Sequence, residues 1–216
     1  MNAERRLPTE NPPSAVRPDL ALISTLVSDN ARVLDVGCGD GTLLELLARD
    51  RGVDGRGIEL SQTGVNACVA RGLSVIQGDA DTDLAGYPDG AFDFVILSQT
   101  IQQARRPADV LKQMLRIGRH AIVSFPNFAH WRMRLNLLFL GRMPRTKALP
   151  YSWYETPNIH QCTLADFELL CRTMNVRIER SFSVWHGARA GTREVIPQSA
   201  WSNLTAEEVL FLLSPA

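Results

Sequence analysis

The sequence predicts a doubly wound α/β fold, with an open, mostly parallel sheet of seven strands and helices on both faces. Two observations carry this prediction. Short apolar segments rich in β-branched residues alternate along the chain with segments whose apolar residues recur at helical spacing. Glycine, proline and polar turn residues separate these segments at intervals that suit strand–helix–strand crossovers. Alternation of this kind gives parallel pairing through right-handed connections.

The composition indicates one folded domain with a full core. Of the 216 residues, 45% are hydrophobic and 21% are charged, which is typical of globular proteins and excludes a disordered or fibrous chain. The formal net charge is zero, so the global basic field that favours nucleic-acid binding is absent. The most apolar stretch, Trp131 to Leu140, is interrupted by Arg132, Arg134 and Asn136 and is too short to span a bilayer. We therefore expect no nucleic-acid partner and no membrane insertion.

The first elements follow from signals near the start of the chain. Residues 19–27 follow Pro18 and carry apolar side chains at helical spacing, which predicts a helix. Residues 32–36 are apolar and β-branched, which predicts a strand. The glycine turn 37–41 comes next, and the leucines after it predict a helix that ends at Gly52.

The same unit repeats through the middle of the chain. Gly72 and Gly118 each end a predicted helix, and the turn Pro88-Asp89-Gly90 leads into a strand. The predicted strands are residues 57–60, 73–77, 92–97 and 120–125, and the predicted helices are residues 61–71 and 107–117.

The pattern loosens after Phe125. Residues 129–140 predict an amphipathic helix, and a loop rich in proline and aromatic residues continues to His160. No composition break marks a second domain. We therefore expect residues 17–216 to form one domain that carries an insertion at about 129–160.

The last elements have clear local signals. Thr163 and Asp166 form a capping-box pattern in which Asp replaces the usual Glu or Gln, and they open a helix that ends at Met174. Residues 176–182 and 209–213 predict the last two strands.

The chain has the features of a cytoplasmic protein. Residues 1–16 contain charges and prolines but no apolar core, so they lack the h-region of a secretory signal and predict a disordered tail. The four cysteines are far apart and form no CxxC pair, so we expect reduced thiols: Cys38, Cys68, Cys162 and Cys171.

The glycine turn is the first candidate binding site. In an open α/β sheet the first strand–helix turn normally holds a cofactor against a helix N-terminus. Gly37, Gly39 and Gly41 allow a ligand to approach the backbone and allow positive φ angles. A dinucleotide-binding fingerprint needs a third glycine, but Thr42 stands at that position, so the sequence disfavours a dinucleotide as the cofactor of this turn.

The string from Val33 to Gly41 resembles motif I of the S-adenosylmethionine-dependent methyltransferases. Asp35, at the end of the strand, can attract the ammonium group of a methionine moiety, which a dinucleotide lacks. Glu59 ends the second predicted strand and can accept hydrogen bonds from both ribose hydroxyls, although it can also cap the next helix.

Further cofactor contacts are implied by this resemblance. Asp79 would receive the adenine amino group and the backbone of Ala80 would meet the ring, although Asp79 is also a common turn former. The full predicted cofactor set is Asp35, Gly37, Cys38, Gly39, Asp40, Gly41, Glu59, Leu60, Asp79, Ala80 and Ser98.

No catalytic group stands out in the sequence. Methyl transfer depends largely on alignment, but a hydroxyl nucleophile benefits from a nearby base. The segment 98–103, after the fourth predicted strand, holds no acid, base or thiol. His130 and His160 are the nearest candidates, and a lone histidine near aromatic residues is more often structural. No zinc-site spacing, nucleophile elbow or phosphate loop is present, and whether the protein is an enzyme stays open.

Longer strings narrow the family. Residues 17–20, 33–41, 97–103 and 125–128, together with 154–160, resemble the methionine biosynthesis protein MetW family. The resemblance implies a Rossmann-like methyltransferase fold, binding of S-adenosylmethionine or S-adenosylhomocysteine, and action with homoserine O-acetyltransferase in methionine synthesis.

Two functions remain open. The first is an accessory protein that contacts the acetyltransferase through an apolar face formed by Trp131, Leu135, Leu138 and Phe139. The second is an active methyltransferase on a small molecule or a protein, in which the 129–160 insertion forms the acceptor pocket.

Overall fold

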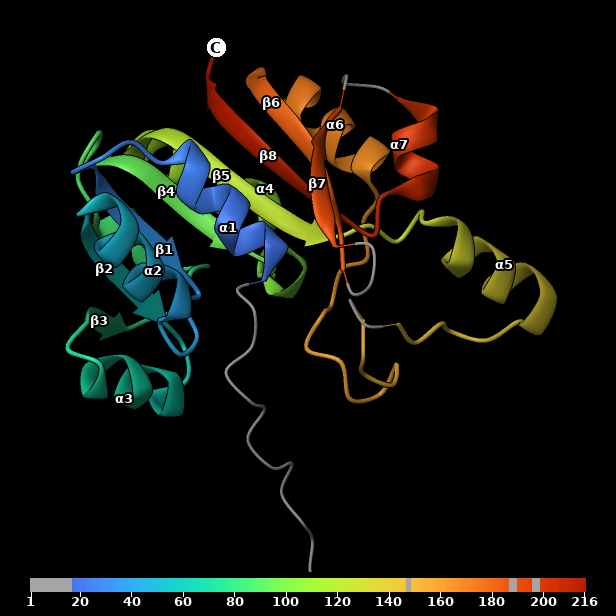
Figure 1. Ribbon diagram of the computed structural model, residues 1–216, viewed down its shortest axis with the longest axis horizontal. Coiled ribbons are helices and arrows are strands. Elements are labelled where there is room, and N and C mark those ends of the chain that lie inside the picture. The colour runs from blue at the N-terminus through green and yellow to red at the C-terminus, as the bar shows by residue number, and fades with distance from the viewer. Residues whose placement is uncertain (1–16, 147–148, 187–189, 196–198) are drawn as a thin grey trace, which may run out of the picture.

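The computed structural model describes residues 17–146, 149–186, 190–195 and 199–216 (Figure 1). The expected tail, residues 1–16, lies outside this range. No helix within it is both long and apolar enough to cross a membrane.

The described residues form one mixed sheet of eight strands in the order β3-β2-β1-β4-β5-β8-β6-β7. Strands β1 to β5 pair in parallel, whereas β8 runs antiparallel between β5 and β6. The strands are β1 Arg32–Val36, β2 Asp54–Glu59, β3 Ser74–Gln77, β4 Phe92–Ser98, β5 Gly118–Pro126, β6 Val176–Trp185, β7 Gly191–Glu194 and β8 Glu208–Pro215.

The predicted fold class is confirmed, but the count of seven strands is wrong. The additional strand is β7, a four-residue edge strand that pairs antiparallel with the end of β6. Its side chains are exposed or half-buried, so it carries no apolar alternation that a sequence pattern could reveal. It forms because β6 offers an unpaired edge.

The helices cover both faces of the sheet. They are α1 Pro18–Leu26, α2 Thr42–Arg51, α3 Gln62–Ala70, α4 Pro107–Ile117, α5 Trp131–Leu140, α6 Leu164–Thr173 and α7 Ala200–Thr205, with short 3₁₀ turns η1 Asp83–Gly86 and η2 Ile101–Gln103. Leucine and isoleucine side chains of α1 and α2 pack on one face. Apolar side chains of α4 and α6 pack on the other. These two layers fix the carboxyl ends of the parallel strands along one edge of the sheet.

Local signals account for most helix ends. Pro107 begins α4, as predicted, and Gly118 ends it and starts β5. Thr163 and Asp166 form the complete capping box at the start of α6, so Asp replaces the usual longer side chain without loss of the motif. The short helix α7 and the two 3₁₀ turns were not predicted because fewer than two helical turns give little periodicity.

The helix α5 stands apart from the body of the protein (Figure 1). Met133 is its one buried residue, at 3% exposure. The expected helix is present, but it is not amphipathic, because its apolar side chains project from both sides and most of them are exposed. Packing against the core therefore does not account for the apolar side chains of α5.

Candidate functional site

The strand order reverses between β1 and β4. From β1 the sheet grows through β2 and β3 on one side and through β4 and β5 on the other. Ligands of open α/β sheets bind outside the carboxyl ends of the strands at such a switch point. The glycine turn after β1 and the segment after β4 meet there.

The three glycines of the turn have left-handed backbones and different surroundings. Gly37, Gly39 and Gly41 have φ angles of +71°, +57° and +81°. A Cβ atom at Gly37 would lie 2.8 Å from the Thr100 side chain, and one at Gly41 would lie 2.4 Å from Leu73 Cδ1. At Gly39 the same position has no described atom within 4 Å. Two glycines are therefore required by packing, and the third leaves an open approach to the backbone.

Glu59 closes one side of this turn. Its Oε2 accepts the Gly39 N–H at 2.9 Å, and its Oε1 accepts the Ser61 N–H at 2.8 Å. A carboxylate has about four acceptor positions, so two remain for the hydroxyls of a ribose. Glu59 thus orders the turn and the start of α3, and it keeps capacity for a ligand.

Asp35 is a buried acid beneath the turn. It is 2% exposed, and no hydrogen bond to its carboxyl group comes from the described residues. Burial, together with the nearby charge of Glu59, raises the pKa of Asp35 to about 7, while Arg17 opposes this shift. A cation placed beside Asp35 would therefore gain a strong partner.

The other predicted cofactor residues divide into two groups. Asp40 caps α2: Thr42 donates to it from both N–H and O–H, and Arg71 pairs with it at 3.0 Å. These contacts and Arg71 lower the pKa of Asp40, although partial burial acts to raise it. The Cys38 side chain is buried against Gly57 and Cys68. These two side chains hold the turn in place.

Asp79 and Ala80 follow β3, and Leu60 follows β2. Asp79 accepts the Asp81 N–H at 2.9 Å, which makes the tight turn that precedes η1. Ala80 is half-buried against the core, and Leu60 is 66% exposed. An exposed leucine at this edge leaves apolar surface for a planar ring.

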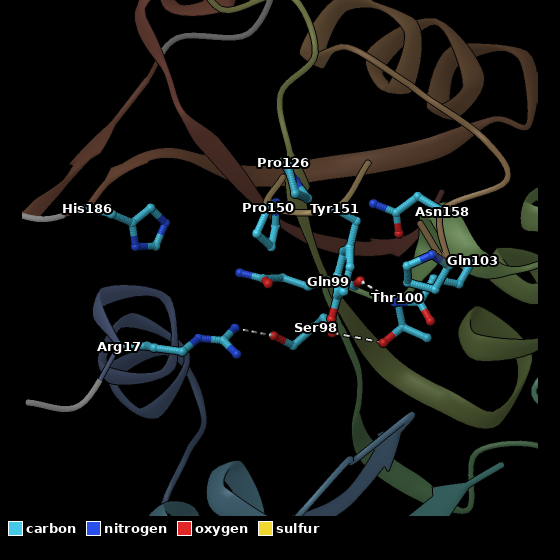
Figure 2. A pocket seen from close by; sticks show the side chains of 11 residues that line it. Arg17, Ser98, Gln99, Thr100, Gln103, Pro126, Pro150, Tyr151, Asn158 and His186 are labelled. Carbon is cyan, nitrogen blue, oxygen red and sulfur yellow. Dashed lines mark hydrogen bonds between the residues drawn. The ribbon is translucent and has the colours of Figure 1, made fainter. Parts of the chain in front are cut away.

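A cavity of about 480 Å³ opens on the opposite side of the switch point (Figure 2). It lies beside the carboxyl end of β4, and the 150–158 segment supplies one wall. Its lining residues are Arg17, Ser98, Gln99, Thr100, Gln103, Pro126, Pro150, Tyr151, Pro157, Asn158 and His186. Of the predicted cofactor residues, Ser98 lines this cavity. Thr100, which packs against Gly37, connects the cavity to the glycine turn.

The two histidines that the sequence offered do not line this cavity. His130 is 6% exposed and caps α5, where its Nδ1 accepts the Arg132 N–H at 3.3 Å. Burial lowers the pKa of His130. The His160 ring lies 3.4 Å from the Arg105 carbonyl oxygen, and its backbone N–H donates to Gln102. Both positions account for these residues structurally.

A third histidine, which no sequence pattern indicates, faces the cavity. His186 Nε2 lies 2.7 Å from Glu208 Oε2, and the Glu208 side chain is fully buried. His186 directly follows β6 and Glu208 begins β8, and the two residues meet because these strands are antiparallel neighbours. No local motif links them, so a sequence pattern could not have found the pair.

Comparison with solved structures defines the class of fold. An S-adenosylmethionine-dependent methyltransferase from Thermotoga maritima, a possible histamine N-methyltransferase, matches 92% of this chain and 88% of its own, with a TM-score of 0.66 and 17% identity. An S-adenosylmethionine-dependent methyltransferase from Mesorhizobium loti matches 89% of this chain and 95% of its own, with a TM-score of 0.62 and 16% identity. The chain has the fold of the S-adenosylmethionine-dependent methyltransferases.

Sequence comparison gives the family. The family model for the methionine biosynthesis protein MetW matches residues 17–213, and the chain belongs to this family. The bifunctional methionine biosynthesis protein MetXA/MetW of Rhodopirellula baltica is 36% identical over 191 residues, which cover 82% of this chain. The chain spans only 30% of the length of that relative. The expected family is confirmed.

Proposed function

We propose that this protein binds S-adenosylmethionine or S-adenosylhomocysteine and acts in the cytoplasm as a partner of homoserine O-acetyltransferase in methionine synthesis. The observation that carries the partnership is the bifunctional relative, whose name joins MetXA and MetW in one protein. Parts that are fused in one protein often associate when they are separate chains.

The residues at the glycine turn fit an S-adenosyl ligand. The open face of Gly39 admits a ligand to the backbone, and Glu59 retains two acceptor positions for a ribose. Asp35 is a buried carboxyl group that accepts no hydrogen bond from the described residues, which suits the ligand's ammonium group. S-adenosylmethionine, when bound, supplies a methyl group on a positively charged sulfur.

Arg17 suits the carboxylate of the same ligand. It precedes α1, lines the cavity and lies close enough to Asp35 to oppose the rise of that acid's pKa. Its guanidinium group is paired with the buried Asp19 and donates to Ser98 at 3.5 Å, so its position is fixed. The chain would hold both charged groups of an amino acid between Asp35 and Arg17.

The helix α5 supplies a surface for the acetyltransferase. Trp131, Leu135, Leu138 and Phe139 lie along one side of the helix and are 42%, 42%, 74% and 73% exposed. Exposed apolar surface of this kind, beside Arg132 and Arg134, is typical of an interface core with a polar rim. A ligand at the switch point would influence this surface if it favours one arrangement of the 150–158 segment.

Co-purification with the acetyltransferase of the same organism tests the proposal. We expect the two proteins to elute together and the specific activity of the acetyltransferase to change when this protein is added. The addition of S-adenosylhomocysteine should alter the size of that change. Separate elution together with equal activity would contradict the partnership.

The second candidate function is methyl transfer to a small acceptor. The cavity beside the glycine turn favours it, because its polar lining offers space for an acceptor next to the bound cofactor.

A further inference from the structure

We infer that the cavity beside β4 is the site of a second, small ligand that carries an O–H or N–H group, and that His186 accepts its proton. This inference rests on the proposed binding of S-adenosylmethionine at the glycine turn. Four features of the structure support it.

The first feature is the division of the switch point into two halves. Glu59, Asp79 and Gly39 lie on the side of β2 and β3, and none of them lines the cavity. The cavity lies on the side of β5, β8 and β6. Thr100 lines the cavity and also packs so close to Gly37 that a Cβ atom there would clash with it. The two halves therefore share a border. Arg17, proposed above to hold the carboxylate of the cofactor, also lines the cavity, so the cofactor would reach this border and meet an acceptor there.

The second feature is the buried carboxylate of Glu208, which is hydrogen-bonded to His186. A fully buried glutamate is unfavourable unless it is paired. Glu208 is 0% exposed, and its Oε2 accepts a short hydrogen bond from His186 Nε2. Its Oε1 is buried and has no hydrogen-bond partner within the described part of the chain. A buried carboxylate with an unpaired oxygen calls for an explanation, and a functional role for Glu208 supplies one.

The third feature is the position of the histidine. The His186 N–H donates to Glu207 Oε2 at 3.0 Å, and Trp185 Nε1 donates to the Thr205 carbonyl at 2.9 Å. These contacts fix the end of β6 against the start of β8. With Nε2 engaged by Glu208, Nδ1 is the acceptor nitrogen of the ring. The side chain is 19% exposed and lines the cavity.

The fourth feature is a strained residue that faces the same space. Gln99 has a φ of +55°, a left-handed conformation that is unfavourable for a residue other than glycine. Its N–H donates to the Ser124 carbonyl at 2.8 Å, which holds the strained backbone in place. Figure 2 shows the Gln99 side chain directed toward Arg17 and His186, with Thr100, Gln103 and Asn158 on the far side. The lining therefore offers hydrogen-bond donors and acceptors on both sides of a polar molecule.

The chemistry that this arrangement supports is balanced. The acceptor oxygen or nitrogen forms a bond to the methyl carbon while the carbon–sulfur bond breaks, and that electron pair stays on sulfur. The acceptor loses its proton to His186, and Glu208 stabilises the resulting imidazolium. Glu208 acts through His186, so it is a positioning residue.

The pH dependence follows from the groups that face His186. Glu208 begins β8 and Glu207 directly precedes it, Asp19 comes from α1, and Arg17 lines the same cavity. The hydrogen bond that His186 donates to Glu208 is the main cause that raises the pKa of His186, with smaller contributions from Asp19 and Glu207, against the effect of burial. Since only neutral His186 accepts a proton, transfer should increase as pH rises through this raised pKa.

Histidine NMR titration gives a test that needs no activity. The chain has four histidines, so each imidazole signal can be assigned by substitution. We expect a higher pKa for His186 than for an unpaired histidine, and a fall in that pKa in Glu208→Gln. S-adenosylhomocysteine should shift the His186 signal. His120, which lies 3.4 Å from Glu179 near the other end of β5, is the internal control and should not respond. A His186 signal that behaves like His120 toward the ligand would overturn the inference.

Radiolabel transfer provides the second test. The purified protein is mixed with S-adenosylmethionine labelled on its methyl group and with the small-molecule filtrate of the source cells. We expect labelled small molecules with the unaltered protein and with His120→Gln, and a loss of about 100-fold or more with His186→Gln. In Glu208→Gln, residual transfer should begin at lower pH. Absence of transfer by the unaltered protein, or equal transfer by His186→Gln, would overturn the inference.

Calorimetry separates this inference from the proposed function. If S-adenosylhomocysteine does not bind, the cofactor proposal fails and the inference fails with it. If it binds with equal affinity to the unaltered protein and to His186→Gln but no transfer occurs, only the inference fails. The substituted side chain is partly exposed, so the variant should fold, and its thermal unfolding is measured alongside.

Discussion

Glu59 Oε2 accepts a hydrogen bond from the Gly39 N–H at 2.9 Å, so the acid at the end of β2 is tied directly to the turn after β1. The same carboxylate accepts the Ser61 N–H that precedes α3. One side chain therefore joins the two strand ends where an adenosyl ligand would lie. Both interpretations that the sequence left open for Glu59, a ribose ligand and a support for the next helix, are compatible with this geometry.

The first prediction concerns the charge of this carboxylate. Glu59→Gln replaces an oxygen with an N–H₂ group that cannot accept from Gly39 or from a hydroxyl. We expect the dissociation constant of S-adenosylhomocysteine to rise by about 10-fold to 100-fold, since a hydrogen bond to a charged group contributes about 1.5–3 kcal/mol. Calorimetry measures it. Asp54→Asn, at the other end of β2, is the matched control, and an unchanged affinity in Glu59→Gln would contradict the assignment.

The second prediction separates backbone strain from ligand access at Gly39. Gly39 and Gly90 have φ angles of +57° and +63°, and a Cβ atom at either position meets no described atom within 4 Å. Gly39→Ala and Gly90→Ala should therefore both lower the free energy of unfolding by about 1 kcal/mol. Only Gly39→Ala should weaken ligand binding. Equal affinities in the two variants would show that no ligand approaches this turn.

The third prediction concerns the stability of the protein without ligand. The pKa of Asp35 is about 7, above its ordinary value of 3.8, so the folded state binds the extra proton between these values. The free energy of unfolding should therefore fall as pH rises through this window. Above pH 7 it should be lowered by the full amount that the ionisation of buried Asp35 causes. Asp35→Asn removes this effect.

Urea unfolding of both proteins across this pH range tests the prediction. We expect Asp35→Asn to be more stable than the unaltered protein above pH 7 and equally stable near the ordinary pKa of Asp35. The same variant should bind S-adenosylhomocysteine more weakly, because it lacks the charge that attracts an ammonium group. A variant that is less stable at every pH would show that the Asp35 carboxylate has a structural partner.

The fourth prediction tests the exposed face of α5. Leu138 is 74% exposed, so Leu138→Asp should leave the free energy of unfolding almost unchanged. Co-elution with homoserine O-acetyltransferase should be lost, because a charge would enter the core of the interface. Leu169→Asp is the matched control, since Leu169 lies on α6 and is 55% exposed. Loss of the complex in both variants, or in neither, would place the interface elsewhere.

The fifth prediction assigns a structural role to Asn127, which lies in one of the strings that carry the family resemblance. Its side-chain N–H₂ donates to the Asn203 and Ala206 carbonyls, and its Oδ1 accepts from Ala129 and Leu164.

Asn127→Ala should lower the free energy of unfolding by about 2–4 kcal/mol, because it leaves several buried groups without partners. Urea unfolding measures the change, and Asn66→Ala, at an exposed position, should change it little. A small effect at Asn127 would mean that water replaces these bonds.

The sequence alone determined the alternation of strands and helices, the glycine turn and the family. These features depend on contacts between residues close in the chain, such as the capping box of Thr163 and Asp166, or on periodicity that burial imposes. The acids after β2 and β3 were also located correctly at strand ends, because parallel strands bring their carboxyl ends to one edge. Whether they bind a cofactor stays a prediction.

Only the tertiary structure decided what meets across the sheet. His186 and Glu208 come together because β8 inserts antiparallel between β5 and β6. Arg17 lines the same cavity because α1, which it precedes, packs on the face of the sheet beside β6 and β8. The sequence does not predict β7, because a short, exposed edge strand has no apolar pattern. The cavity and its histidine depend on pairing between strands that are far apart in the sequence. Local sequence patterns do not show which strands become neighbours in the sheet.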